Sequence, residues 1–141
     1  MKGVLFLCLF FTMCKLSLHS LESWFFGLGA EANAHTREAV AAGGGLSFGL
    51  DINRNFALGL KAAISYNFDT LAAIEPLAFF RYYPPLGIGG PFMQAEAGTV
   101  VYFEHGLAYP AFSGGLALGW RFALGQNIYI EPLFRGGYPF A

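Results

Sequence analysis

Seven charged side chains between residues 61 and 135 share one feature: each lies on the same side of an alternating apolar and polar pattern. They are Lys61, Glu75, Arg81, Glu96, Arg121, Glu131 and Arg135. Four are cations and three are anions, so ion pairs can neutralise most of the charge if the side chains meet in a confined space. We predict that they form an ion-pair network in the lumen of the folded protein.

Catalysis is the competing use of these carboxylates. Glu96, Glu131 and Arg135 could form a cluster in which a carboxylate titrates and acts as a general acid or base. Ion-pair networks are ordinary structural features of proteins, however, and we favour structural pairing over catalysis.

An internal echo links two of the segments that carry these charges. The sequence Ile-Glu-Pro-Leu occurs at residues 74–77, before Arg81, and again at residues 130–133, before Arg135. The echo fits either a strand pattern that the fold uses twice or a paired site built from two similar strands. We favour the repeated strand.

Motifs of metal or nucleophilic chemistry do not stand out. The histidines His19, His35 and His105 have no second ligand at the spacing of a metal site, and a weak surface site formed by His105 with Glu104 is the less favoured interpretation. The Gly-x-Ser-x-Gly spacing at residues 45–49 lies inside an alternating run and not at a turn from a strand into a helix, so we do not interpret it as a nucleophile elbow. The glycines at 43–45 are not followed by Gly-Lys-Ser/Thr. We therefore expect no catalytic residues, no metal and no cofactor.

The segment from Phe56 to Phe68 shows how the charges are positioned. Apolar residues occupy every second position, while Lys61 and small or polar residues lie between them. Side chains alternate across a β-strand, so this segment has one apolar and one polar face. A Lys or Arg facing lipid at mid-depth costs about 2–4 kcal/mol, so a wall with charges on one side only suits a membrane. The residues expected to face lipid are Phe56, Leu58, Leu60, Ile64, Leu116, Leu118, Trp120 and Phe134.

Alternation of this kind recurs between turn signals, and each run suits a tilted transmembrane strand of about 9 to 11 residues. Pro76 and Pro132 lie inside two runs, where we expect a local bulge. The pattern predicts an all-β fold, an antiparallel up-and-down transmembrane β-barrel of about eight strands, of which the sequence shows seven as alternating runs. The seven runs are Ser23–Glu31, Ala39–Ile52, Phe56–Phe68, Ala72–Tyr83, Phe92–Phe103, Ala111–Ala123 and Ile128–Tyr138.

Composition fits a membrane location. Hydrophobic residues make up 55% of the 141 residues and charged residues only 12%, whereas an ordinary soluble domain carries about 25% charged residues. The net charge of −1 offers no basic surface for nucleic acid.

Residues 1–22 are predicted to be a signal peptide, because Lys2 precedes an apolar run, Val4–Met13, that is too short to span a membrane as a helix. Both cysteines, Cys8 and Cys14, lie in this segment, so residues 23–141 would form a single barrel domain without disulfides. Lipidation of Cys14 is the less favoured alternative, because Met13 is not the small residue expected before a lipidated cysteine.

The alternating faces, the short Gly/Asn turns and the Arg-x-Tyr and Glu-Pro elements of the strands resemble those of small bacterial outer-membrane β-barrels, of the eight-stranded OmpA-like and OmpW-like type. The resemblance covers residues 23–141. It implies an outer-membrane location, a lipid bilayer as partner and insertion by the barrel-assembly machinery. Single-chain bacterial barrels normally have an even number of strands, so seven runs leave three explanations: a further strand near the N-terminus, a missing last strand, or an unusual closure.

Three functions follow from these patterns. The leading one is a small outer-membrane barrel, either structural or a narrow passive channel for small solutes; an eight-stranded interior is just wide enough for side chains to fill, which favours a plug. The second is a surface barrel that binds or adheres through loops at residues 32–38, 68–71 and 104–110. The third is a secreted, soluble, calycin-like barrel with an apolar ligand, which would reverse the two faces. The sequence predicts no particular solute, surface ligand or oligomeric state.

Overall fold

The computed structural model describes residues 23–35, 41–66, 72–85, 90–104 and 106–140. The predicted signal peptide lies outside these residues. Among the residues described, no helix is long and apolar enough to cross a membrane. The strands are β1 (Ser23–His35), β2 (Ala41–Asp51), β3 (Phe56–Tyr66), β4 (Ala72–Tyr82), β5 (Gly90–Glu104), β6 (Leu107–Ala123), β7 (Ile128–Ile130) and β8 (Leu133–Phe140).

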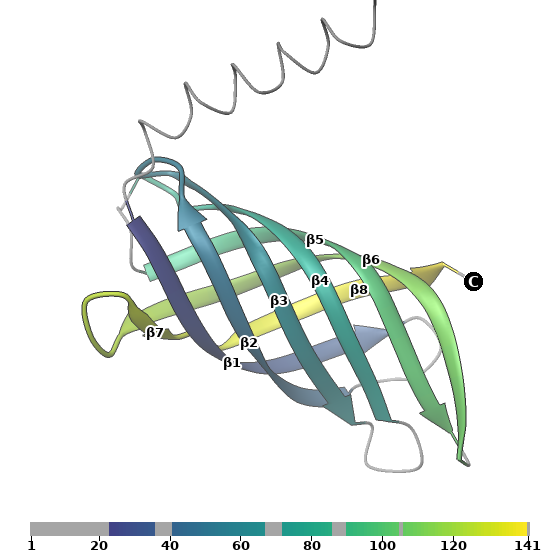
Figure 1. Ribbon diagram of the computed structural model, residues 1–141. Helices are drawn as coiled ribbons and strands as arrows, with labels where there is room; N and C mark the ends of the chain where they lie inside the picture. Colours follow the sequence, from purple (N-terminus) through teal and green to yellow (C-terminus); the bar gives the residue numbers. More distant parts are fainter. Residues whose placement is uncertain (1–22, 36–40, 67–71, 86–89, 105, 141) are drawn as a thin grey trace, which may run out of the picture.

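The strands form one sheet whose hydrogen-bonded neighbours make a closed ring. β1 to β6 pair in chain order, each antiparallel to the next. β7 and β8 follow one another along the same line, and both pair antiparallel with β6 and parallel with β1. They therefore share one place between β6 and β1, and the ring has strands at seven places. Figure 1 shows the tilted strands wrapping around a common interior.

The described chain is all-β with eight strands in one sheet, as predicted, but the parallel seam corrects the expectation that all neighbouring strands are antiparallel. With an odd number of places, an up-and-down order brings the last strand back in the same direction as the first, so these two can pair only in parallel. The unusual closure is thus the explanation that the described strands support. An eighth place is not needed to satisfy the edges of β1 and β6.

The expected bulges at the two prolines are wrong. Pro132 divides the seventh run into β7 and β8, because proline cannot donate a ladder hydrogen bond, yet the register with β6 is the same on both sides of the break. The Pro132 carbonyl still accepts a hydrogen bond from the Trp120 N–H at 3.0 Å. Pro76 stays inside β4, paired with Ala62, and only the ladder to β5 is interrupted there.

Two predicted connections are also shorter than expected. β1 continues past Glu31 to His35, because Asn33 pairs with Ala41 on one edge and with Arg135 on the other. Backbone pairing on both edges thus holds a segment whose polar composition suggested a loop. β6 begins at Leu107, inside the expected loop 104–110, after a turn in which Gly106 adopts a positive φ of 80°.

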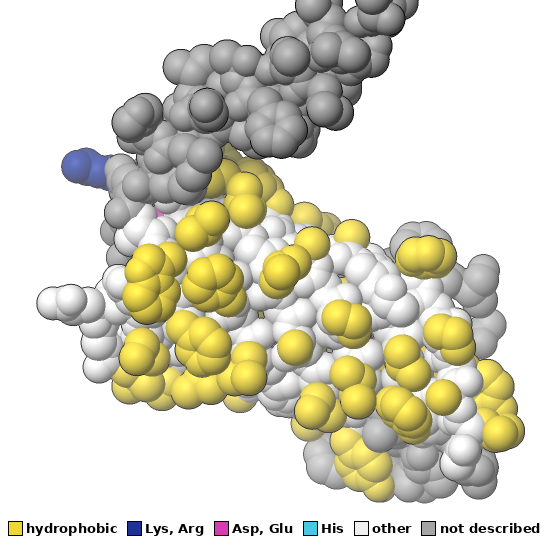
Figure 2. Space-filling model, viewed as in Figure 1, with side chains coloured by type: hydrophobic (Ala, Val, Ile, Leu, Met, Phe, Trp, Pro, Cys, Tyr) yellow, Lys and Arg dark blue, Asp and Glu magenta, His cyan; other side chains and the backbone are white. Residues whose placement is uncertain are grey.

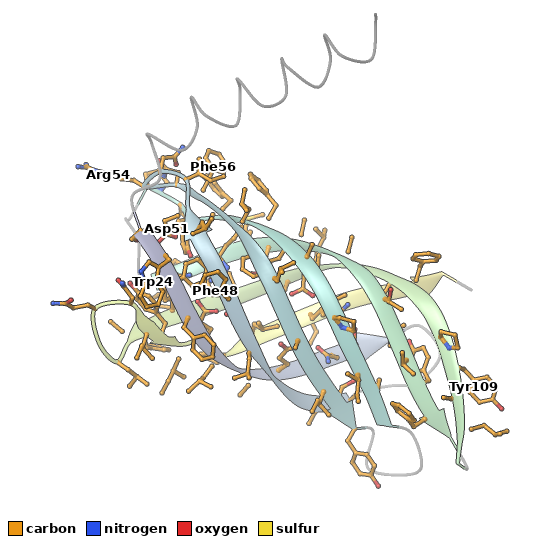
Figure 3. All side chains as sticks on the ribbon, in the orientation of Figure 1. Trp24, Phe48, Asp51, Arg54, Phe56 and Tyr109 are labelled. Carbon is orange, nitrogen blue, oxygen red and sulfur yellow. The ribbon has the colours of Figure 1, made fainter. Side chains whose placement is uncertain are left out.

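The two ends of the ring differ in what fills them. The Arg54 end, which contains the turns at residues 53–55 and 124–127, holds a buried cluster that includes Phe25, Phe79, Tyr83 and Phe92. The opposite end, called the Gly106 end, contains the start of β6 and the end of β8. Figure 3 labels Arg54 and Tyr109 at these opposite ends.

Closure can be tested by a disulfide across the seam. Ala32 and Phe134 are direct partners on β1 and β8, within the reach of a disulfide. In a chain with Cys8 and Cys14 replaced by Ser, we expect the pair Ala32→Cys and Phe134→Cys to crosslink on oxidation of the folded protein, as measured by mass spectrometry after proteolysis. Ala32→Cys with Leu118→Cys should not crosslink, because Leu118 lies one strand further away; the reverse outcome would contradict the seam.

Candidate functional site: ion pairs inside the ring

The structure brings the seven predicted charged residues together inside the ring. All are buried, with at most 5% of their surface exposed. Two further carboxylates, Glu31 on β1 and Asp51 on β2, are buried with them. They lie on the inward side of the alternating pattern, which is the signal that could have added them to the predicted network.

Glu131 is the centre of a first cluster, here called the Glu131 cluster. Both of its carboxylate oxygens accept from Arg81, with Nη1 to Oε1 at 2.6 Å and Nη2 to Oε2 at 3.0 Å. Arg121 donates from Nε to Oε1 at 2.8 Å, and its Nη1 lies 3.7 Å from Asp51 Oδ1. Ser47 donates to Oε2 at 3.0 Å. One carboxylate thereby binds two guanidinium groups, and the planar, two-pronged contact with Arg81 fixes the orientation of that side chain.

Aromatic rings enclose the two guanidinium groups of this cluster. Arg81 Cζ lies 3.9 Å from the centroid of the Phe92 ring, and Arg121 Cζ lies 3.9 Å from that of Phe25. Such contacts stabilise a cation that has lost its water. Tyr83, in the connection after β4, also accepts from Arg81. Burial raises the pKa of the Tyr83 phenol to about 12, so this hydroxyl stays neutral and adds no charge.

The second cluster is centred on Lys61 and is here called the Lys61 cluster. Lys61 Nζ lies 2.6 Å from Glu31 Oε1 and 2.8 Å from Glu96 Oε1. Arg135 pairs with Glu96 through Nε at 2.8 Å and also with Glu75.

Gln94 joins the two clusters. Its Oε1 accepts from Arg81 Nε at 2.6 Å, and its amide nitrogen donates to Glu96. Gln94 shares the inward parity of Glu96, so the sequence pattern could have included it. The interior is therefore one connected network. Glu96 and Glu131, which the less favoured catalytic interpretation grouped with Arg135, bind different cations, and of the two only Glu96 pairs with Arg135.

The internal echo becomes a reciprocal pairing in the structure. Arg81, from the first copy of the motif, binds Glu131 of the second copy, and Arg135 of the second copy binds Glu75 of the first. The two segments are β4 and the broken strand β7–β8, which are not ladder neighbours. The repeated pattern thus supplies two pairs that cross the interior.

A small residue makes room for this network. A Cβ atom on Gly27 would collide with Ser47 Oγ and with the Glu131 carboxylate.

Among the described residues, no group of three or more His, Cys, Asp or Glu side chains could hold a metal ion. The geometry suits charge compensation within a filled interior.

Comparisons with known proteins gave no match. No protein-family model, no curated protein and no solved structure is similar to this chain at a significant level.

Removal of the central carboxylate should destabilise the fold strongly. Glu131→Gln leaves Arg81 buried without a carboxylate, and breaking a buried pair in this way costs about 3–5 kcal/mol. We expect that loss in the free energy of unfolding, measured by urea titration in detergent, whereas Arg54→Gln at the exposed turn should change it by less than about 0.5 kcal/mol.

A double-mutant cycle separates the pair from a general effect. Arg81→Met combined with Glu131→Gln should cost less than the sum of the two single changes, because the second change no longer leaves a charge unpaired. Additive costs would show that the two side chains are not coupled.

Proposed function

We propose that the protein is a small membrane-spanning β-barrel and a compact structural element of the membrane, because ion-paired side chains fill its interior. The outer wall carries the proposal. Large apolar side chains are exposed on nearly every strand, including Leu60, Leu116 and Phe112. Figure 2 shows one face of the molecule, where hydrophobic side chains are spread over the whole wall.

The distribution of charge supports the same proposal. Nine charged side chains are buried inside the ring, and among the charged side chains that the structure describes only Arg54 is exposed. On the face in Figure 2, the one dark-blue side chain lies at the edge of the molecule, where Figure 3 labels Arg54. A soluble protein of this size would need polar groups over its surface, whereas a lipid-facing wall must exclude them.

The residues expected to face lipid lie on this outer wall. Seven of the eight are exposed: Leu58, Leu60, Ile64, Leu116, Leu118, Trp120 and Phe134. Phe56 is half-buried, because its ring packs against those of Phe80 and Tyr82. The distances between ring centroids are 5.5 Å to Phe80 and 5.3 Å to Tyr82. Figure 3 shows Phe56 at the Arg54 end, near the edge of the wall.

Aromatic side chains mark both edges of the wall. At the Arg54 end Trp24 stacks on Phe48 and Trp120 on Phe122, while at the Gly106 end Tyr66, Phe103, Tyr109 and Phe112 are exposed. Aromatic residues gather where the hydrocarbon meets water. The 11-residue strands β2, β3 and β4, at about 3.3 Å per residue and a tilt of about 40°, cover roughly 28 Å, close to the height of a hydrocarbon core.

The two other functions fit these features less well. A calycin-like barrel would need an apolar interior, but the described interior holds nine charged side chains. A binding barrel would use extended surface loops, and β6 already begins at Leu107, inside one of the three expected loops.

Because the chain resembles small outer-membrane barrels, we propose that the protein lies in a bacterial outer membrane and is inserted there by the barrel-assembly machinery.

A matched pair of arginine substitutions tests the membrane location. Leu60→Arg, in the middle of β3, should lower the free energy of unfolding in lipid vesicles by about 2–4 kcal/mol, whereas Leu124→Arg, in the turn after β6, should cost about 0–1 kcal/mol. Both leucines are well exposed. If both changes cost less than about 0.5 kcal/mol, as on an ordinary soluble surface, the wall does not face lipid.

The filled interior predicts no ion conduction. The purified protein in a planar bilayer should give no stepwise currents at any applied voltage, because the buried rings and the Glu131 cluster obstruct the interior toward the Arg54 end. Reproducible single-channel events would favour the narrow passive channel instead, and their absence in a preparation with native β circular dichroism would support the structural role.

A further inference from the structure

The buried charges inside the ring do not balance. The Glu131 cluster holds two cations, Arg81 and Arg121, and two anions, Glu131 and Asp51. The Lys61 cluster holds two cations, Lys61 and Arg135, against three carboxylates. These are Glu31, Glu75 and Glu96. The excess negative charge of the described interior therefore belongs to the Lys61 cluster.

Glu31 is the carboxylate with the least compensation. Its Oε1 contacts Lys61, but Lys61 is shared with Glu96. Its Oε2 is buried and has no hydrogen-bond partner in the described part of the protein. The ion pairs and hydrogen bond of Arg135 go to Glu75, Glu96 and Ser113, and none goes to Glu31.

Asn33 is a second buried side chain beside Glu31 that lacks hydrogen-bond partners. It lies two positions along β1 on the same inward side as Glu31 and is 1% exposed. Neither its amide oxygen nor its amide nitrogen has a hydrogen-bond partner among the described residues. Its ladder neighbours are Ala41 on β2, which has no polar side-chain atom, and Arg135 on β8, whose guanidinium binds Glu75, Glu96 and Ser113. Buried amides are almost always hydrogen-bonded, so this pair of free atoms points to a ligand.

We propose that Glu31 and Asn33 bind a small primary ammonium ion that carries a neighbouring oxygen. The ammonium group donates to Glu31 Oε2 and Asn33 Oδ1 and supplies the missing positive charge, while the oxygen accepts from Asn33 Nδ2. A bare metal ion would leave that donor unserved. The ligand is a free small molecule, because side chains that are at most 5% exposed are beyond the reach of a lipid headgroup outside the wall. Of the two ends of the ring, the Gly106 end is the nearer to Asn33, because β1 ends there at His35.

The inference needs only the closed ring, so it stands apart from the membrane location. The test is a titration of the full, folded protein in detergent with ethanolammonium chloride, followed by ¹⁵N NMR of the Asn33 side-chain amide. Tetramethylammonium chloride at equal ionic strength is the control, since it has the same charge and no N–H donor. We expect a saturable shift with ethanolammonium alone.

Two variants locate the binding. Glu31→Gln should weaken ethanolammonium binding at least about tenfold, because it removes a charged acceptor. Asn33→Ala, measured by calorimetry, should weaken it about two- to tenfold, and it keeps the inference testable if Glu31→Gln does not fold. Asn127→Ala, an asparagine in the turn at the far end, is the matched control and should bind like the wild type. No saturable shift, equal shifts with both salts, or unchanged affinity in Asn33→Ala would overturn the inference.

Discussion

Closure of the sheet is the constraint on which the rest of the structure depends. An open sheet would leave two rows of unpaired backbone groups, and in hydrocarbon each such group costs several kcal/mol. Here a single parallel seam between β1 and the pair β7–β8 removes both edges. Parallel pairing is slightly weaker per residue than antiparallel pairing, and Pro132 removes one donor from this seam. The ion pairs of Glu131 and Arg135 fasten the seam strand to β4 and β5 across the interior.

Charge and space on the inner wall are two parts of one arrangement. Long ionic side chains from β3, β4, β6 and β8 need inward neighbours that occupy little volume, and glycines such as Gly27 supply that volume. Because the arginine side chain is planar, it can bind a carboxylate at its edge while aromatic rings approach it. Arg121 Cζ lies 3.9 Å from the centroid of the Phe25 ring and 4.4 Å from that of the Tyr129 ring. The outer wall then keeps only apolar and aromatic residues, since the charges have partners within.

The inward and outward placement of residues could be predicted from the sequence because a strand repeats every two residues. Lys61 and Leu60 are neighbours in the chain, and period two alone assigns them to opposite faces. Which charges would pair could not be predicted, because Arg81 and Glu131 are 50 residues apart and their meeting depends on how the ring closes. The same limit hid the parallel seam, since local alternation carries no information about the partner of a first strand. The roles of Glu31 and Asp51 were missed for a smaller reason: the network was predicted only from the later runs.

An odd number of strand places puts the start of β1 and the end of β8 at opposite ends of the ring. β1 starts at the Arg54 end, and β8 finishes at the Gly106 end. In a barrel with an even number of strands both ends would emerge on one side, and anything joined to them would share a compartment. Here β1 starts and β8 finishes at opposite ends of the ring, so in the proposed membrane location the sheet would begin on one side of the bilayer and end on the other.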